Sequence, residues 1–476
     1  MQEPGERALG QRLDLRDRLV FTIDPDDARD HDDALSVASG TSGGWEVGVH
    51  IADVSHYVPP DSAIDREARA RGTSCYLPGG VHPMLPEHLS ANVCSLVPGR
   101  DRLALSVFAE LDADANPVAA RFEETVIRSA YRLAYGDVQE VFEGRKSYPE
   151  ELQAALETLR PIARALRRRR LAAGALELEI PEVKVRVDEA GVPLRMERRV
   201  QRESHQLVEE FMLLANRCVG AEGTRRASGL LYRVHEPPPP RKLAELDETL
   251  KALRLPRPGS LVDPARALQA LLRVPLDPAH RRMLHRLVLR SLTRARYLER
   301  DLGHFGLATG EYCHFTSPIR RYPDLHNHRR VREWIHRRRS GAWDPAALEG
   351  LAAECSGTEQ NAAEAERTAV RIKGLRVLEG RLGDHASGTI TAFLRHGFFV
   401  ELDDPPVDGF VRPSMTLDDY FTLDPTGVRM TGRRTRRRFT LGDTVRVVVA
   451  RVDVPGRECD LALEPTHRPT RRQRGR

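Results

Sequence analysis

The sequence predicts an α/β fold of the α+β type, followed by a small all-β barrel. Three observations indicate this arrangement. Apolar and polar residues alternate with period two in much of the segment from about 19 to 110, as half-buried strands require. Apolar residues then recur at helical spacing through the middle of the chain. From about residue 381 short strands return, with glycines at the turns between them, which is typical of a small barrel.

In the first quarter of the chain we expect strands interrupted by one helix. The clearest alternating segments are residues 45–51 and 103–111. Residues 61–71 are expected to form a helix, because Asp61 suits an N-cap and Gly72 a stop.

Beyond about residue 135 the expected elements change character. Residues 180–187 are expected to form one arm of a hairpin, and the expected helices are 137–142, 150–173, 204–221, 242–253, 263–272, 278–297, 324–338 and 345–378. The expected barrel strands are 386–393, 398–402, 409–412, 443–454 and 460–463. The inferred domains are a charged lead-in at 1–18, a large mixed domain at 19–380, a barrel domain at 381–465 and a basic tail at 466–476.

Composition excludes several classes of protein. A chain of 476 residues is long enough for more than one domain, and its net charge of +5 is too small to imply nucleic acid by itself. Six cysteines without a C-x-x-C pair favour reduced thiols in a cytoplasmic protein over a zinc site or a disulfide framework. No apolar run approaches the ~20 residues that span a bilayer, so no membrane partner is expected.

A cluster of aspartates is the feature around which the chain is organised. The apolar run 19–23 ends at Asp24, and Asp30, Asp32 and Asp33 follow just before a second apolar run. Carboxylates packed this closely repel one another, and a folded chain tolerates them where cations neutralise them. Hard divalent ions such as Mg²⁺ bind oxygen ligands of this kind.

Two simpler explanations of the cluster are an acidic surface loop and a calcium loop of the EF-hand type. The second fails, because the glycine and the glutamate that such a loop needs at its sixth and twelfth positions are missing. The position between two apolar strands argues against a solvated loop. The pattern therefore indicates a two-metal phosphoryl site.

Residues 21–35 resemble the signature of the ribonuclease II and ribonuclease R family, whose catalytic domain is the RNB domain. Further motifs occur in the family's order at 50–58, 75–79, 207–216, 233–237 and, most clearly, 314–325. The segment 388–443 resembles the OB domain named after ribosomal protein S-one. The resemblance implies a hydrolytic, processive 3′-to-5′ exoribonuclease that uses two Mg²⁺ ions, with Mn²⁺ as the alternative. Its partner would be single-stranded RNA and its products nucleoside 5′-monophosphates.

The aspartate pattern and the family motifs together give a set of candidate site residues. Asp24, Asp30, Asp32 and Asp33 would hold the metal ions, and Arg320 would reach the scissile phosphate. By resemblance, the nucleotide would be contacted by Tyr76 near the 3′ end, Tyr135 as a stacking ring, Glu209 or Glu210, and Glu366. The family's second clamp aromatic, near residues 184–186, has no aromatic counterpart here.

The predicted barrel carries its own candidates for RNA binding. Phe398, Phe399 and Phe410 could all be core, and Phe398 is our candidate for a ring that stacks on a base. Arg395 and Arg412 would hold phosphate, and the run 433–438 and the basic tail would add a sequence-independent electrostatic attraction. Structural alternatives for these residues are core packing and solvated surface.

Two other function classes remain open on the sequence. One is a catalytically silent RNA-binding regulator with the same fold, and the other is a metal-dependent endonuclease or DNA-directed nuclease. We expect a monomer. Family members usually carry cold-shock OB domains ahead of the catalytic domain, for which residues 1–18 leave no room, so we also expect structured RNA to be handled differently.

Overall fold

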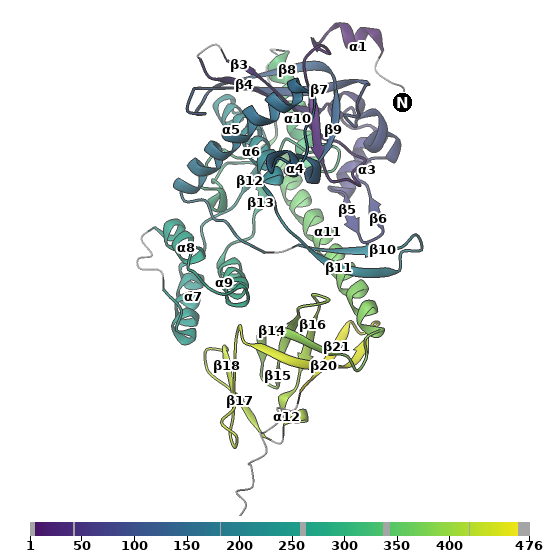
Figure 1. Cartoon of the computed structure of the whole chain (residues 1–476). Coiled ribbons are helices and arrows are strands. Elements are labelled where there is room, and N and C mark those ends of the chain that lie inside the picture. Colours follow the sequence, from purple (N-terminus) through teal and green to yellow (C-terminus); the bar gives the residue numbers. More distant parts are fainter. Residues whose placement is uncertain are drawn as a thin grey trace, which may run out of the picture.

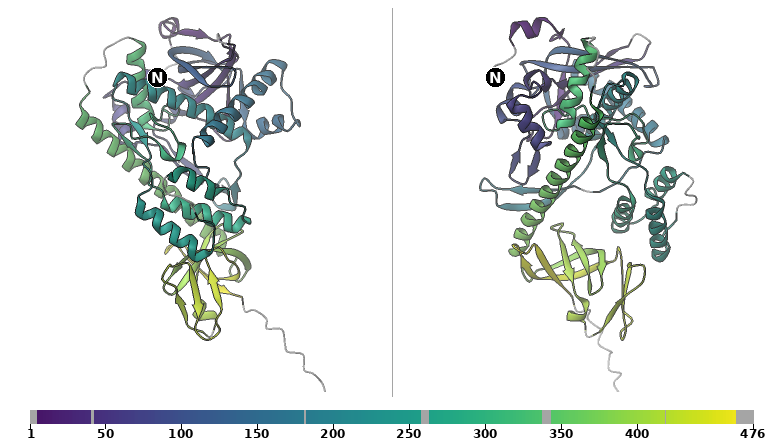
Figure 2. Two further views of the ribbon diagram at one scale, coloured as in Figure 1. Left: turned by 90° about the vertical axis from the view of Figure 1, so that its left-hand side faces the viewer. Right: turned by 180° about the vertical axis from the view of Figure 1, so that it is seen from behind.

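The computed structural model describes residues 5–40, 43–180, 182–257, 263–336, 343–417 and 419–464. A large mixed domain lies above a small β-barrel, and the long helix α11 (Pro345–Glu379) runs from one to the other (Figures 1 and 2). The predicted fold class is confirmed. The predicted basic tail at 466–476 lies outside the described residues.

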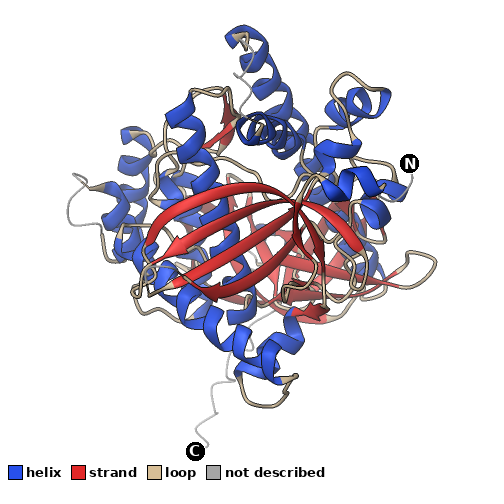
Figure 3. Ribbon diagram, turned by 90° about the horizontal axis from the view of Figure 1, so that it is seen from above, coloured by secondary structure: helices blue, strands red, loops and turns tan. Residues whose placement is uncertain are grey.

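The large domain is built on a seven-stranded sheet with the order β1-β8-β7-β4-β3-β2-β9. Its central pairs are antiparallel, whereas β1 pairs with β8 and β2 with β9 in parallel. Seen from above in Figure 3, the sheet curves over the helices beneath it. Its strands are β1 Leu13–Leu15, β2 Phe21–Asp24, β3 Asp33–Ser39, β4 Trp45–Ala52, β7 Asp101–Leu111, β8 Pro117–Arg128 and β9 Tyr131–Ala134.

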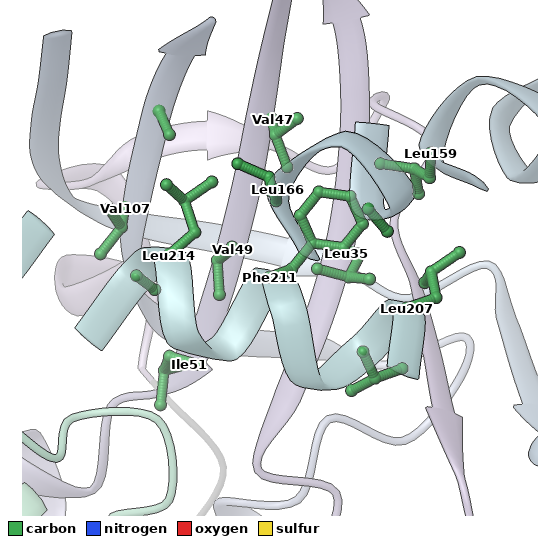
Figure 4. Close-up of a cluster of buried hydrophobic side chains, with 14 of the residues drawn as sticks. Leu35, Val47, Val49, Ile51, Val107, Leu159, Leu166, Leu207, Phe211 and Leu214 are labelled. Carbon is green, nitrogen blue, oxygen red and sulfur yellow. The ribbon is translucent and has the colours of Figure 1, made fainter. Parts of the chain in front are cut away.

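Helices α5 (Glu150–Ala172) and α6 (Glu203–Arg226) cover one face of this sheet. Phe211 of α6 is fully buried against Leu35 and Val49 of the central strands (Figure 4). Burying such a ring contributes about 2–3 kcal/mol relative to leaving it in water. The apolar residues that alternate along the strands and those that recur at helical spacing along α6 therefore pack into one core. This packing fixes α6 against the sheet.

Shorter elements complete the large domain. The remaining helices are α1 Glu6–Gly10, α2 Val54–Tyr57, α3 Ala63–Arg71, α4 Tyr135–Phe142, α7 Pro240–Leu253, α8 Pro264–Leu272, α9 Pro278–Ser291 and α10 Tyr322–Ile335, with a π-helix at Leu89–Val93 and a 3₁₀ turn at Phe305–Leu307. Three two-stranded hairpins or pairs are formed by β5 Cys75–Leu77 with β6 Gly80–His82, β10 Glu182–Val187 with β11 Pro193–Arg199, and β12 Tyr232–Val234 with β13 Arg296–Leu298.

The helix expected at 278–297 is too long: it ends at Ser291, because Arg296–Leu298 pairs with β12 as strand β13. Within the lead-in expected at 1–18, Leu13–Leu15 forms β1, the edge strand of the sheet. Both strands have only three residues, too few for a period to be visible in sequence.

Helix α11 is tied to the large domain along its length. Its residues Glu354 and Glu359 pair with Arg69 of α3 and Arg233 of β12, at 2.8 and 2.6 Å. Further along, Glu366 accepts a hydrogen bond of 2.6 Å from the backbone N–H of Tyr76. Within the described residues, no helix is both long enough and apolar enough to cross a membrane.

The C-terminal part of α11 packs against the closed five-stranded barrel β14-β15-β16-β21-β20 and the hairpin β10–β11. A three-stranded sheet, β17-β18-β19, is inserted between α12 (Pro413–Thr416) and β20. The strands are β14 His385–Leu394, β15 Gly397–Leu402, β16 Asp408–Val411, β17 Phe421–Leu423, β18 Arg429–Gly432, β19 Arg438–Thr440, β20 Thr444–Asp453 and β21 Glu458–Leu463.

The N-terminal segment is anchored by a buried ion pair. Arg12 lies 2.5 Å from the carboxylate of Asp53, whose side chain is fully buried at the end of β4. By contrast, the pair between Arg16 and Asp14, also 2.5 Å apart, is exposed. Arg12 and Arg16 are only four residues apart in the chain, so the two ion pairs differ mainly in how deeply they are buried.

Replacing Arg12 with methionine should lower the free energy of unfolding by about 3 kcal/mol, because Asp53 would remain buried without its counter-charge. Urea unfolding followed by circular dichroism measures the loss. The control Arg16→Met removes solvent-accessible pairs with Asp14 and Asp101 and should cost about 1 kcal/mol or less. Equal losses in the two variants would contradict the anchoring role of Arg12.

Candidate active site

The aspartate cluster occupies the connection between β2 and β3, which we call the acidic loop (residues 24–33). Asp24 is the last residue of β2 and Asp33 the first of β3. Pro25, which has no N–H to donate, directly follows β2 and starts the loop. Asp24 and Asp32 are buried, so the loop is not the solvated surface turn that composition alone would favour.

Protein groups engage three of the four carboxylates. Asp24 is 2.7 Å from Nδ1 of the buried His31, and Asp30 accepts a hydrogen bond of 3.2 Å from the hydroxyl of Tyr76. Asp32 accepts a hydrogen bond of 2.9 Å from the backbone N–H of Ile319. For the carboxylate of Asp33, no hydrogen bond or ion pair is found among the described residues.

The electrostatics of the loop favour bound cations. Burial, and secondarily repulsion from Asp24, raise the pKa of Asp33 to about 8. Burial also raises the pKa of Asp32 well above its ordinary value, against the opposing effect of Arg320. Both carboxylates therefore resist ionisation in the bare protein, and a divalent ion would stabilise their charged forms.

Arg320 belongs to a loop that is fixed from two sides. The buried Asp324 accepts hydrogen bonds from the backbone N–H of Ser317 (2.8 Å) and from the guanidinium of Arg321 (2.7 Å). On the other side, the N–H of Ile319 bonds to Asp32, which brings Nε of Arg320 to 3.6 Å from the same carboxylate. The conformation of this loop is thus coupled directly to the acidic loop.

A cavity of about 540 Å³ opens beside these two loops. Asp33 and Arg320 contribute to its wall, together with Tyr135 at the start of α4 and Glu209 on α6. Its other lining residues are Ile180, Glu182, Arg199, Gln201, His205, Val208, Met212, Leu213, Asn216, Tyr312, Thr316, Ser317 and Arg321. Residues far apart in sequence therefore combine carboxylates, guanidinium groups and aromatic rings around one space.

The structure separates the two neighbouring glutamates. Glu209 lines the cavity, where its carboxylate accepts a hydrogen bond of 2.8 Å from Gln201. Glu210 is buried and pairs with Arg170 of α5 at 2.5 Å. Glu210 therefore lies outside the cavity lining to which Glu209 contributes, because successive helical residues point about 100° apart.

Tyr76 and Glu366 lie together on the side of Asp30. Tyr76 is 40% exposed, its hydroxyl reaches Asp30, and its backbone is held by Glu366. Neither residue lines the cavity defined above, although the acidic loop connects their position to it.

The stacking role expected for Phe398 is wrong. Its side chain is fully buried in the barrel core, where the ring of Phe439 from the inserted sheet lies 5.0 Å away. Phe399 and Phe410 point to the other side of the barrel wall and pair with each other at 5.1 Å. Arg412 lies over the ring of Phe410 at 4.9 Å and also bonds to Asp460.

Arg395 is exposed in the turn between β14 and β15, as a phosphate-binding residue requires. The run at 433–438 is also mainly exposed, in the connection between β18 and β19. Arg395 and the run 433–438 are thus accessible from solvent, and their geometry alone does not identify a ligand for them.

Sequence reasoning gave too little weight to three residues. His31 lies among the aspartates and bonds to Asp24, a contact that the spacing of the aspartates does not indicate. Arg321 follows Arg320 and lines the same cavity. His205 stacks on Tyr135, a contact between two helices for which the sequence carries no local signal.

The donor chemistry of the acidic loop fits hard divalent cations, since it offers carboxylate oxygens with raised pKa values. Among the described residues, however, no three His, Cys, Asp or Glu side chains already converge on one point as a complete metal centre does. Three of the four carboxylates are instead held by protein groups. The acidic loop therefore offers the kind of ligand atoms that hard divalent cations prefer, but these atoms are not already arranged around one point.

These features define a mixed α/β domain with a polar, carboxylate-lined cavity, followed by an oligonucleotide-binding type of barrel. Comparison with known proteins agrees: the model of the RNB domain matches residues 12–337 and that of the S1 RNA binding domain matches 380–464. The chain belongs to the RNB family.

Similar proteins give the same assignment. Ribonuclease R of Thermotoga maritima is 39% identical over 462 residues, which cover 95% of this chain and 65% of that relative. The chain thus spans slightly less than two thirds of the relative's length. Among solved structures, Mycoplasma genitalium RNase R in complex with ribose methylated single-stranded RNA matches with a TM-score of 0.90 at 29% identity, covering 97% of this chain and 73% of that chain.

A more distant structure shares the fold alone. Yeast Ssd1, described as a pseudonuclease, matches with a TM-score of 0.70 at 20% identity, covering 90% of this chain and 54% of that chain. The fold by itself therefore does not decide whether a protein is catalytic, and the side chains of the site must carry that argument.

Replacing Asp33 with asparagine should stabilise the protein in EDTA, and this gain should increase as the pH rises from about 4 to about 8. The raised pKa means that folded Asp33 retains a proton which the unfolded chain releases above about pH 4, so the wild type loses stability through that range. Urea unfolding of both proteins across the range measures the difference.

Asp26→Asn is the matched control, because Asp26 is an exposed residue of the same loop. Its difference from the wild type should not change with pH in this way. A pH-independent difference for Asp33→Asn would contradict the raised pKa.

Proposed function

We propose that this chain is a Mg²⁺-dependent hydrolytic exoribonuclease that degrades single-stranded RNA processively from the 3′ end to nucleoside 5′-monophosphates. The observation that carries the proposal is the meeting of Asp32, Asp33 and Arg320 beside a cavity that Tyr135 also lines. Relatives named Ribonuclease R and a similar structure in complex with single-stranded RNA support it.

The metal ions would be held by Asp24, Asp30, Asp32 and Asp33, with Mg²⁺ as the proposed ion, two of them during catalysis, and Mn²⁺ as the alternative. When bound, divalent ions supply charge neutralisation and an activated water for attack on phosphorus. The raised pKa values of Asp32 and Asp33 support this assignment, because a cation offsets the cost of ionising them.

The chain's own residues would bind and orient the strand. Arg320 would donate to the non-bridging oxygens of the scissile phosphate and offset the charge that develops there. Tyr135 would stack on a base. Glu209, Glu366 and Tyr76 would contact the terminal nucleotide, and a carboxylate that accepts from the 2′-hydroxyl would distinguish RNA from DNA.

The barrel would hold RNA further from the cavity. Phe399 and Phe410 provide partly exposed rings on which bases can stack, and Arg412 and Arg395 lie on or beside the same strands for phosphate contacts. This arrangement replaces the platform expected at Phe398. Stacking and phosphate contacts of this kind do not depend on the base sequence of the RNA. A processive exonuclease needs such contacts, because it must accept every base in turn.

A catalytically silent RNA-binding protein is the main alternative, given the pseudonuclease with the same fold. The presence of all four aspartates argues against it, because a protein that only binds RNA gains nothing from buried carboxylates that repel phosphate. An endonuclease or a DNA-directed nuclease is the other alternative.

The proposed location is the cytoplasm, and the six unpaired cysteines are consistent with it. The proposed oligomeric state is a monomer, and a single chain supplies every proposed site residue.

Replacing Asp32 with asparagine should lower the turnover of RNA by about two orders of magnitude or more, because one ionic metal ligand is lost, while RNA binding is retained. The assay follows 5′-labelled RNA and DNA oligomers on a sequencing gel, with Mg²⁺ and with EDTA. The wild type should give a ladder of progressively shortened RNA with Mg²⁺ only.

Asp26→Asn again serves as the control and should keep wild-type turnover. Internal cuts would indicate an endonuclease, and equal cleavage of DNA would indicate a DNA-directed enzyme. Absence of cleavage with retained RNA binding would indicate the silent regulator. Unchanged turnover in Asp32→Asn would remove Asp32 from the mechanism.

Replacing Phe399 and Phe410 together with alanine should weaken the binding of long RNA by about tenfold or more, the scale of one lost base-stacking contact. Filter binding in EDTA with a long and a short oligomer measures the effect, which should be smaller for the short one. Phe398→Leu is the control: it should reduce the stability of the barrel without a direct loss of RNA contacts. Wild-type affinity in the double variant would exclude the rings as a platform.

A further inference from the structure

Two aromatic rings are stacked in the wall of the cavity. Tyr135 is the first residue of α4 and His205 the third of α6, and both line the cavity together with Asp33. Their ring centroids are 4.2 Å apart and their planes differ by 10°. Two helices that are separate in sequence thus place a parallel pair of rings beside the acidic loop.

The ring of His205 is fixed in place. Its Nδ1 accepts a hydrogen bond of 3.2 Å from the backbone N–H of Arg202, which closes the N-terminus of α6. The adjacent N–H of Ser204 bonds to Gln139 of α4 at 3.2 Å, so the two helix ends are tied together. Burial, with Arg199 and Arg202 nearby, lowers the pKa of His205 to about 4, and the ring is therefore neutral near pH 7.

This geometry limits how a base can reach Tyr135. A base cannot enter between rings whose centroids are 4.2 Å apart, because each stacked contact needs about 3.5 Å of its own. A base can stack only on an outer face of the pair. His205 cannot swing aside without losing the hydrogen bond that caps its helix.

The hairpin β10–β11 also borders the cavity, through Glu182 and Arg199, but it offers no aromatic ring there. Lys184 in β10 instead forms an ion pair of 2.7 Å with Asp27 of the acidic loop. Within residues 182–187 there is no aromatic side chain to sandwich a base against Tyr135.

We propose that His205 is a positioning residue for RNA: it holds the ring of Tyr135 from behind so that a base stacks on the pair as a third layer. This inference rests on the proposed function, because it gives His205 a role in the cavity where the proposed enzyme would bind RNA. It divides the role of His205 into two separable parts, a ring that supports stacking and a nitrogen that caps α6.

Three variants separate these parts. His205→Phe keeps a ring and loses the acceptor, His205→Asn keeps an acceptor near the position of Nδ1 and loses the ring, and His205→Ala loses both. Each is tested in EDTA with a set of short unstructured RNA oligomers, each carrying one 2-aminopurine at a successive position from the 3′ end. Stacking quenches the fluorescence of this base, so binding and stacking are measured without catalysis.

In the wild type and in His205→Phe, one position of the set should be strongly quenched on binding. His205→Asn and His205→Ala should bind about fivefold more weakly, the scale of a single aromatic contact, and should lose that quenching. Thermal unfolding of each variant checks that the fold is intact. Under turnover conditions the same two variants should raise KM for short oligomers more than they lower kcat.

The reverse ranking would overturn the inference: a normal His205→Asn with a defective His205→Phe would make His205 a helix cap only. Wild-type quenching and affinity in all three variants would overturn it as well. If the wild type itself binds none of the oligomers, the proposed function fails, and that outcome is distinct from a failure of the His205 assignment.

Discussion

The arrangement of the site depends on the cost of burying like charges together. Asp24, Asp32 and Asp33 come to the edge of the sheet because β2 ends and β3 begins there, and their mutual repulsion is not relieved by water. The surrounding structure compensates in part, through the N–H of Ile319 and the guanidinium of Arg320. The repulsion that remains uncompensated is the property on which the proposed binding of cations to this loop depends.

Neighbouring elements are arranged around this constraint. The loop that carries Arg320 is held by the buried Asp324, so the guanidinium meets the acidic loop at a fixed position. Helix α6, fixed against the sheet by Phe211, supplies another wall of the cavity. The proposed site residues on these elements therefore extend from segments that hydrogen bonds or core packing hold in place, which keeps a site ordered before any substrate binds.

Local patterns in the sequence predicted much of this site, and the failures have physical causes. The aspartates and Arg320 lie in short contiguous motifs, so their meeting could be anticipated. Glu209 and Glu210 could not be separated, because the choice depends on how α6 is rotated against α5. The burial of Phe398 could not be anticipated, because the sheet β17–β19, which covers it, lies in an arginine-rich segment without clear periodicity. The stacking of His205 on Tyr135 joins residues 70 positions apart, and no local pattern records such a contact.

Helix α11 has a consequence for how the two domains can vary. It is one continuous element of 35 residues, or about 50 Å, that is bonded to the large domain through Glu354, Glu359 and Glu366 and packed on the barrel near its end. Adding or deleting one residue between these points would turn the barrel by about 100° and shift it by about 1.5 Å. The number of residues between these two points of α11 therefore sets the orientation of the barrel about the helix axis, relative to the cavity. A change in the length of the helix would therefore misalign the two domains at once.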